Sequence, residues 1–449
     1  MVVKKKNGKS AFIHPDIPKW LAFRAEGART LELCDGTRSE RDIIETISRE
    51  FNEPMEYVGK GVAGLLSHCE KQGFFQDVTP KRPDALPVEM KILYLNITRE
   101  CNLRCTYCYA SAGAQREKEL TLEEIKKLLS EFHALGKGTR QNVIITGGEP
   151  LLRKDFWQIA EYARSLGLVL VLSSNGLLID RETARKLGKL FGGVQISLDG
   201  DREMHDKCRG KGSFDGATRG IENLVEAGIT PSISATVTKE NFKKLDNLWD
   251  VCDKYKIKHV KTNPIIPLGR AESDRDEIML SRDEYIELWR ATKQQLKKRR
   301  LEVTIDNERS IFSGGTSFKG TGNSCGAGRT SISFESNGDA YPCQASHLPQ
   351  FLCGNIREKS LEEIVTGAEV LKDWMGRSIN DIPGCSSCEW KMYCGGGCFL
   401  QAALGHGTVH APDVYCDVYK FEYEETFWEF VDKREKEQEE SNDGQAAKV

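Results

Sequence analysis

The sequence predicts an α/β protein: a partial (β/α)6 barrel of parallel strands, with a winged-helix domain before it and a cysteine-rich domain after it. Short apolar runs alternate six times with amphipathic segments between residues 91 and 263, which is typical of a parallel sheet with helical crossovers. A separate helical pattern precedes this region, and clustered cysteines follow it. A chain of 449 residues is also too long for one ordinary domain.

The N-terminal region has the pattern of a small winged-helix fold. A strand is expected over 20–23, followed by helices over 26–33, 43–51 and 55–72. Ser39 and Asp42 are suited to cap the second of these helices. Prolines 80, 83 and 87 then mark a linker. Winged helices often bind DNA, but this segment has no dense basic patch, which disfavours that function.

The central region supplies the strands of the barrel. Its apolar runs lie at 91–97, 142–146, 168–173, 194–198, 229–237 and 259–263, with amphipathic segments near 121–136, 154–166, 180–191, 214–228 and 242–256. Thr121 and Glu124 form a capping-box pattern at the start of the first of these helices. Sheets of this kind bind ligands at the carboxyl ends of their strands, so we expect the site there.

Domain boundaries follow from these patterns. They are expected at 1–80 for the N-terminal domain, 81–88 for the linker, 89–312 for the barrel, 313–432 for the cysteine-rich domain and 433–449 for a tail. The tail is polar and charged, a composition typical of disorder.

Composition narrows the class of partner and compartment. The net charge of −3 predicts neither nucleic acid nor an anionic membrane surface as a partner. No secretory signal is evident at Met1, and no apolar stretch approaches the roughly 18 residues of a membrane-spanning helix. Fifteen cysteines in such a chain suggest metal or redox sites rather than disulfides. We therefore expect a protein of the reducing cytoplasm.

Three cysteines at CxxxCxxC spacing, Cys101, Cys105 and Cys108, directly follow the first apolar run. Three thiolates on one tight loop can hold three irons of a cubane cluster and leave the fourth iron open for a small molecule. A zinc loop is the alternative, but zinc sites usually need four ligands, and no fourth Cys or His lies nearby in the sequence.

Further candidate residues follow the other strands. Gly147, Gly148 and Glu149 end the second run, where the glycines would let the backbone approach a ligand and Glu149 would offer an acceptor for an ammonium group. The next two runs end in Ser174 and Asn175 and in Ser197 and Asp199, and Arg209 comes soon after. A guanidinium suits a carboxylate. The alternative is that the serine, asparagine and aspartate residues are ordinary turn residues.

CxxxCxxC with Tyr107 before its last cysteine resembles the radical S-adenosylmethionine (SAM) superfamily. The resemblance implies that the open iron chelates SAM and that one electron splits the sulfonium to give a 5′-deoxyadenosyl radical. It further implies SAM contacts from Tyr107, Gly147, Gly148 and Glu149. Contacts are likewise implied from the strand-end residues Ser174, Asn175, Ser197 and Asp199, and from Arg209 at the SAM carboxylate.

The remaining cysteine cluster resembles the SPASM extension of that superfamily, which carries two auxiliary 4Fe–4S clusters. The resemblance implies a distal cluster on Cys385, Cys388, Cys394 and Cys416 and a proximal one on Cys325, Cys343 and Cys398. Cys353 is a candidate fourth ligand, although some relatives leave that iron open. With the barrel loop, this makes three 4Fe–4S clusters.

The N-terminal run EGARTLELCDGTRSERDII resembles PqqD, the peptide-binding chaperone of pyrroloquinoline quinone biosynthesis. The same fold recurs as the recognition element of enzymes that modify ribosomally made peptides (RiPPs). It implies capture of a leader peptide as an added strand at a sheet edge. A domain kept for stability or dimerisation is the alternative.

Together these features suggest a radical SAM maturase that cross-links a precursor peptide, and that takes electrons from a reductant such as flavodoxin or ferredoxin. A thioether is favoured over a C–C bond, because a proximal cluster with an open iron could hold the peptide cysteine. Gln344 follows Cys343 where sulfatase-maturing relatives carry an aspartate base, so formylglycine formation is disfavoured and the catalytic base stays unknown. The competing hypotheses are a radical SAM enzyme for a tetrapyrrole and a non-catalytic iron–sulfur electron carrier.

Overall fold

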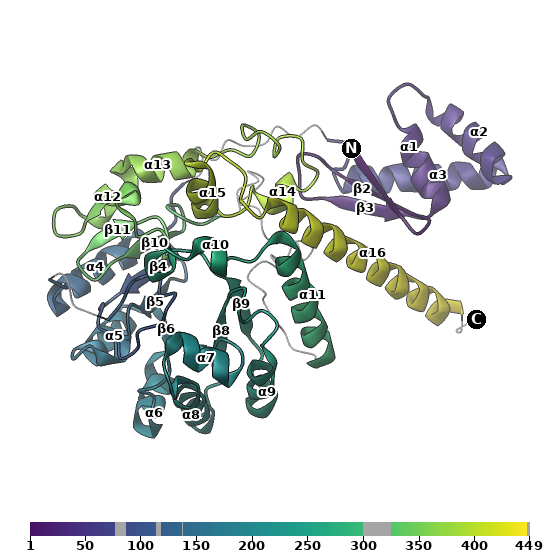
Figure 1. The fold of residues 1–449 in the computed structure, drawn as a ribbon. Helices are drawn as coiled ribbons and strands as arrows, with labels where there is room; N and C mark the ends of the chain where they lie inside the picture. Colours follow the sequence, from purple (N-terminus) through teal and green to yellow (C-terminus); the bar gives the residue numbers. More distant parts are fainter. Residues whose placement is uncertain (77–86, 114–117, 137, 300–324, 447–449) are drawn as a thin grey trace.

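The computed structural model describes all residues except 77–86, 114–117, 137, 300–324 and 447–449. Figure 1 shows a curved barrel, a C-terminal region packed along one edge of it, and an N-terminal domain set to the side. No helix within the described residues is both long and apolar enough to span a membrane. The expected linker and the start of the expected C-terminal domain lie largely outside the described residues, so these boundaries stay predictions.

The N-terminal domain is a three-stranded antiparallel sheet with three helices. The strands β1 (Val2–Lys6), β2 (Lys9–Ile13) and β3 (Trp20–Phe23) pair in chain order. The helices are α1 (Ala25–Leu33), α2 (Glu40–Phe51) and α3 (Met55–Lys71), and Ser39 and Asp42 form the expected capping box of α2. The hairpin β1–β2 was not expected, because the lysines of β1 hide the apolar alternation of an ordinary strand.

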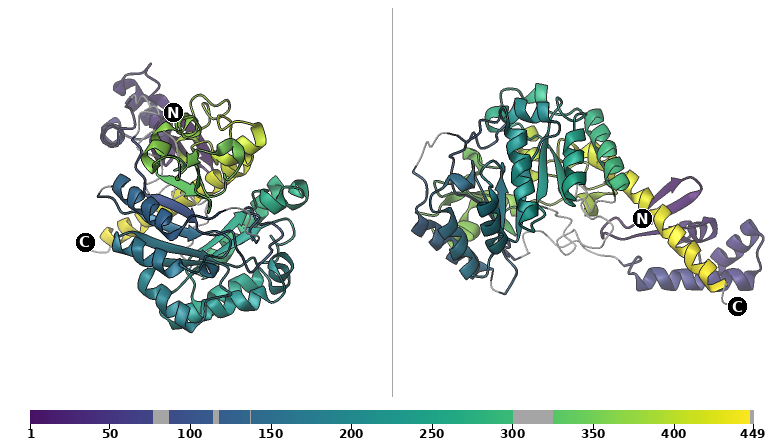
Figure 2. Two further views of the ribbon diagram at one scale, coloured as in Figure 1. Left: turned by 90° about the vertical axis from the view of Figure 1, so that its left-hand side faces the viewer. Right: turned by 90° about the horizontal axis from the view of Figure 1, so that it is seen from below.

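The barrel strands are confirmed as six parallel neighbours in chain order. They are β4 (Ile92–Asn96), β5 (Asn142–Thr146), β6 (Val169–Ser174), β7 (Gly193–Ser197), β8 (Ser232–Val237) and β9 (Val260–Pro264). The connecting helices are α4 (Leu122–Leu135), α5 (Phe156–Ser165), α6 (Arg181–Leu190), α7 (Arg202–Arg209), α8 (Ser213–Glu226) and α9 (Asp246–Tyr255), with α10 (Arg275–Ile278) and α11 (Arg282–Arg299) beyond them. Figure 2 shows the helices packed outside the curved sheet.

Strand alternation separates a dry outer face from a polar inner one. Leu93 and Leu95 of β4 are fully buried in the main hydrophobic core with the outer helices. Because successive strand side chains point to opposite faces, Tyr94 and Asn96 lie on the inner face. The same alternation places Thr146 of β5 inward, so the barrel interior is lined largely by polar groups.

The C-terminal region adds three strands to the barrel sheet. The strand β10 (Ser331–Phe334) runs parallel to β4, and β11 (Asp339–Tyr341) and β12 (Gly354–Asn355) follow antiparallel. The resulting sheet has nine strands. It is followed by α12 (Leu361–Gly367), α13 (Glu369–Gly376), α14 (Lys391–Cys394), α15 (Phe399–His406) and α16 (Cys416–Ala446).

The helix α16 corrects one expectation. It extends to Ala446, so the tail predicted to be disordered over 433–449 is helical over most of that range. Lys, Arg, Glu and Gln are strong helix formers, so a polar composition by itself does not prevent a helix. Figure 2 shows α16 running beside the N-terminal domain.

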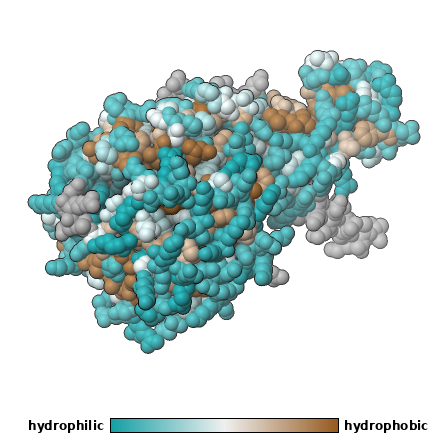
Figure 3. Space-filling view, in the orientation of Figure 1, coloured by the Kyte–Doolittle hydropathy of each residue, from teal (hydrophilic) through white to brown (hydrophobic). Residues whose placement is uncertain are grey.

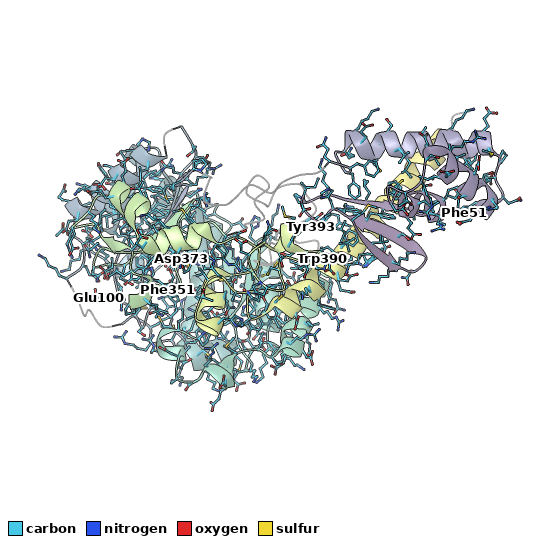
Figure 4. All side chains as sticks on the ribbon, turned by 90° about the horizontal axis from the view of Figure 1, so that it is seen from above. Phe51, Glu100, Phe351, Asp373, Trp390 and Tyr393 are labelled. Carbon is cyan, nitrogen blue, oxygen red and sulfur yellow. The ribbon has the colours of Figure 1, made fainter. Side chains whose placement is uncertain are left out.

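The N-terminal sheet docks on α16 and on the segment around Trp390. Ala11 and Ile13 of β2 are fully buried in one cluster with Trp390, Tyr393 and Phe427. Figure 4 shows Trp390 and Tyr393 between the N-terminal sheet and α16. The face shown in Figure 3 is predominantly hydrophilic, with apolar groups at this junction and in separate patches over the main body.

Candidate active site

The cysteine loop follows β4 at the carboxyl end of the barrel, as expected. Cys101, Cys105 and Cys108 are partly buried free thiols. Burial raises the pKa of Cys101 to about 11, and the nearby Cys105 and Cys108 add to the rise. The structure therefore places the three sulfurs in one neighbourhood. Among the described residues, no group of three His, Cys, Asp or Glu side chains is arranged to bind one metal ion. A cubane cluster does not need such a group, because each thiolate binds a different iron.

The glycines after β5 have a packing role, and their expected contact with SAM stays a prediction. A Cβ on Gly147, where φ is 138°, would lie 2.3 Å from the Thr98 carbonyl oxygen. A Cβ on Gly148 would lie 2.2 Å from the Glu100 carbonyl oxygen. The Gly148 N–H also donates to Thr98 O at 2.8 Å. These glycines thus let the β5 loop press against the chain that leads into the cysteine loop.

Glu149 is held by groups at the end of the next strand. Its carboxylate is fully buried, and it accepts hydrogen bonds from the Ser174 hydroxyl at 3.0 and 3.1 Å and from the Asn175 N–H at 2.9 Å. Burial raises the pKa of Glu149 to about 7, against the effect of these hydrogen bonds. The side chain joins the ends of β5 and β6, and its expected contact with an ammonium group stays a prediction.

Asp199 is likewise turned inward. It is fully buried and accepts from the Tyr107 hydroxyl, from two nitrogens of Arg209 and, at 2.8 Å, from the Thr236 N–H. Burial would raise the pKa of Asp199, but Arg209 outweighs it and the pKa is lowered. Asp199 thus holds Arg209 and Tyr107 in place, and its expected contribution to the SAM pocket stays a prediction. The carboxylate that pairs with Arg209 in this structure is that of Asp199.

The other strand-end residues lie at the expected edge. Asn175 donates from its side-chain nitrogen to Asn102 Oδ1 at 2.7 Å, which ties the end of β6 to the cysteine loop. Ser197 is partly buried at the end of β7, on the strand face opposite the buried Ile196. Contact of either residue with SAM stays a prediction.

A second support of the loop was not recognised in the sequence. Arg270 donates from Nε to the Cys105 carbonyl at 2.7 Å, and its backbone N–H donates to the Cys108 carbonyl at 3.1 Å. A Cβ on Gly269, where φ is 62°, would lie 2.3 Å from the Tyr109 carbonyl oxygen. The available signal was a Gly-Arg pair shortly after the last barrel run, at a strand end where ligand sites form.

A buried charged group joins the C-terminal region to the barrel mouth. Glu335 pairs with Arg99 at 3.1 Å and with His347 Nδ1 at 3.0 Å. Burial would raise the pKa of Glu335, but His347 and Arg99 lower it to about 2. His347 also lies 2.7 Å from the Ser333 hydroxyl. This group was not predicted, because its members are far apart in sequence.

The four cysteines assigned to the distal cluster line one cavity. The walls of this cavity include Cys385, Cys388, Cys394 and Cys416. Trp390, Tyr419 and Tyr423 supply much of the remaining wall. Four thiols around one such cavity match the donor set of a cubane cluster.

The proximal set is also brought together. Cys398 lies near enough to Cys325 and Cys343 for those thiols to raise its pKa, in addition to the larger effect of burial. Cys353 is 7% exposed, and burial raises its pKa to about 12 with a contribution from Cys343. The structure thus places the candidate fourth ligand beside this group, and its role stays a prediction.

Comparison with known proteins agrees with this arrangement. The Radical SAM superfamily profile matches residues 95–252, and the profile of the SPASM iron–sulfur cluster-binding domain matches residues 325–389. Fe-coproporphyrin III synthase from Methanosarcina barkeri is 33% identical over 367 residues, which cover 74% of this chain and 88% of that protein. Mycofactocin maturase MftC from Mycolicibacterium smegmatis is 31% identical over 334 residues, which cover 71% and 81%.

Two solved structures share the fold. The anSMEcpe structure with bound AdoMet has a TM-score of 0.63 at 22% identity and covers 76% of this chain and 98% of that one. Streptococcus suis SuiB bound to its precursor peptide SuiA has a TM-score of 0.60 at 16% identity and covers 92% and 100%. The SuiB comparison therefore extends over most of the present chain.

Proposed function

Since the chain belongs to the radical SAM superfamily and carries a SPASM domain, we propose that it is a maturase that cross-links a ribosomally made precursor peptide. The observation that carries this proposal is the N-terminal domain. Its strand β3 stands at the edge of the sheet β1-β2-β3, and the whole domain is docked on the cysteine-rich region. An extended peptide can add to such an edge through main-chain hydrogen bonds.

In this proposal Cys101, Cys105 and Cys108 hold the cluster that binds SAM, and the bound group supplies a 5′-deoxyadenosyl radical. Arg209 and the Gly147–Glu149 loop shape that end of the barrel. Cys385, Cys388, Cys394 and Cys416 hold the distal auxiliary cluster. Cys325, Cys343 and Cys398, with Cys353 as the candidate fourth ligand, hold the proximal one. A thioether is the favoured product.

The docking of the N-terminal domain would hold a bound leader in a fixed relation to the barrel. Lys4 of β1 pairs with Glu389 and with Glu424 at 2.7 Å each, and its ammonium lies 5.3 Å from the Trp390 ring centroid. Trp20 of β3 packs edge-on against Phe427 of α16, with ring centroids 5.1 Å apart. A leader on β3 would therefore be anchored to the body that carries the cysteines.

A second candidate substrate is a tetrapyrrole, which the identity to Fe-coproporphyrin III synthase favours. The barrel wall argues for the peptide. Among the described positions of β4 to β10 that face the barrel interior, Lys261 is the one Lys or Arg residue. The other inward-facing residues are uncharged, and they include Asn96, Thr146, Gln195 and Ser234. A ligand with several carboxylates is usually bound by several Arg or Lys groups.

The deciding experiment is an anaerobic reaction of the reconstituted protein with SAM, reductant and either a candidate precursor peptide or Fe-coproporphyrin III. We expect the peptide to lose two hydrogens by mass spectrometry and to lose one alkylatable thiol if a thioether forms. Conversion of the tetrapyrrole with no peptide bound would overturn the proposal. Absence of SAM cleavage with either substrate would instead favour the non-catalytic electron carrier.

A further inference from the structure

A surface hollow lies on the outer side of the cysteine loop. It encloses about 700 Å³ of empty space, open to solvent, and its walls come from the cysteine loop, from Leu177 and from the end of α7 with the turn after it. Asn102, Arg104 and Thr106 of the loop are exposed here. Of the residues expected to contact SAM, Arg209 alone is among the described residues that line it, so the hollow adjoins the candidate active site without being part of its interior.

The two walls of the hollow are joined directly behind the cysteines. The Thr106 N–H donates to the Cys208 carbonyl at 2.9 Å, and Arg104 Nη1 donates to the Cys101 carbonyl at 2.7 Å. Arg270 contacts another side of the loop, and the Gly147–Gly148 turn packs against the residues that lead into it. The hollow is therefore a place where the chain that carries Cys101 and Cys105 reaches solvent.

The lining of the hollow is basic. Arg104, Lys207, Arg209 and Lys211 contribute to it, and no Asp or Glu is present among its described lining residues. Arg209 is neutralised by Asp199, and Lys207 pairs at 2.8 Å with Glu240, which lies outside the lining. Arg104 binds backbone carbonyls, which leave its charge intact, and Lys211 is exposed. Asp206 lies just outside the lining and accepts hydrogen bonds from Gly212 and Ser213, so the excess positive charge at the hollow comes from Arg104 and Lys211.

We propose that this hollow docks a small acidic electron-carrier protein, with Lys207 and Lys211 facing its carboxylates. The inference rests on the proposed assignment of Cys101, Cys105 and Cys108 to a cluster. In the step itself the carrier is oxidised by one electron and the cluster is reduced by one, and no bond is made or broken. A carrier must approach the loop closely, and a positive surface raises the association rate of an acidic partner.

The test is the double variant Lys207→Glu/Lys211→Glu in the reconstituted enzyme. SAM cleavage is measured with reduced flavodoxin and separately with dithionite, which is small enough not to need a docking surface. We expect the flavodoxin-driven rate at low salt to fall about tenfold or more, with the dithionite-driven rate unchanged. Flavodoxin binding, measured by calorimetry, is expected to weaken in parallel. Arg104 and Arg209 are left intact because they contact the loop and Asp199.

A matched control is Lys186→Glu/Lys189→Glu on α6, which makes the same charge change on exposed lysines of another helix. It should leave the flavodoxin-driven rate within about twofold of the wild type. Equal loss in the two double variants would show that overall charge, and not this surface, governs the rate. An unchanged rate and affinity in the Lys207/Lys211 variant would also overturn the proposal.

Two further outcomes separate this inference from the proposed function. If dithionite drives no SAM cleavage in the wild type, the cluster assignment fails and the docking proposal fails with it. If the wild type cleaves SAM but yields no peptide product, the proposed substrate fails while the docking test keeps its meaning. Competition by inorganic phosphate at constant ionic strength would indicate a small-anion site in place of a protein-docking surface.

Discussion

The cysteine loop at the barrel mouth and the distal four-cysteine cavity are built in opposite ways. The loop takes its three thiols from a single segment, Cys101–Cys108, and one side of it reaches solvent. The distal cavity collects its thiols from a turn, from the end of α14 and from the start of α16. Its aromatic wall is backed by the N-terminal hairpin. The open arrangement suits entry of electrons and a small ligand, and the closed one suits retention of a cluster.

Removing the cysteines of one region at a time should give the largest difference in activity between the two regions. Changing Cys101, Cys105 and Cys108 to Ala should abolish SAM cleavage, because no open iron would remain, while the auxiliary clusters survive. Changing Cys385, Cys388, Cys394 and Cys416 to Ala should spare cleavage and prevent the cross-linked product. Iron and sulfide content and deoxyadenosine formation are the measurements. Cleavage retained in the first variant would contradict the assignment.

The backbone support of the loop can be tested with Gly269→Ala. The new Cβ would meet the Tyr109 and Cys108 carbonyl oxygens at 2.3 and 2.5 Å, so we expect loss of the loop's cluster and at least a tenfold fall in SAM cleavage. Gly228→Ala is the matched control, because Gly228 also has positive φ, 81°, but has no atom within 4 Å of an added Cβ. The control should cost about 1–2 kcal/mol of unfolding free energy and keep its iron. Similar iron loss in both would mean that backbone strain alone is responsible.

The buried carboxyl group of Glu149 at the barrel mouth predicts a pH dependence of stability. Its pKa in the folded chain is about 7, raised by burial above the ordinary value of 4.5, so the folded state holds the proton more tightly than the unfolded chain. Stability should therefore fall as the pH rises from about 4.5 to about 7, by about 3 kcal/mol at most from this group. Urea unfolding at several pH values measures the slope. Glu149→Gln should flatten it, and an equal slope in that variant would assign it to other groups.

The smallest effect on stability is expected at the interface between the N-terminal hairpin and the wall of the distal cavity. Lys4→Ala removes two ion pairs and a contact with Trp390, which adjoins the cavity, and should cost about 1 kcal/mol. Lys5→Ala on the same strand removes one pair, with Glu32 inside the domain, from a side chain 64% exposed, and should cost less. Limited proteolysis should release the N-terminal domain faster from the Lys4 variant. Equal release from both would show that Lys4 does not hold this domain.

Many of the secondary-structure elements of this protein, and the position of its cysteine loop, can be predicted from short segments of the sequence. The six barrel strands, the capping boxes at Ser39 and Thr121 and the position of the cysteine loop each depend on periodicity or spacing within one short segment. Such signals persist whatever the rest of the chain does, because they express the backbone's own geometry. The resemblance of the later cysteines to the SPASM extension, and not their spacing alone, assigned to one cluster the four thiols that line the cavity.

The tertiary structure decided which way the strand-end side chains turn and which distant segments meet. Buried donors from neighbouring strands hold the carboxylates of Glu149 and Asp199, and no pattern within one segment shows these donors. The pairing of β10 with β4, the support of the loop by Arg270 and the hairpin packed on α16 join residues far apart in sequence. A local pattern states that a residue is buried or polar, whereas its partner is selected by the packing of the whole chain.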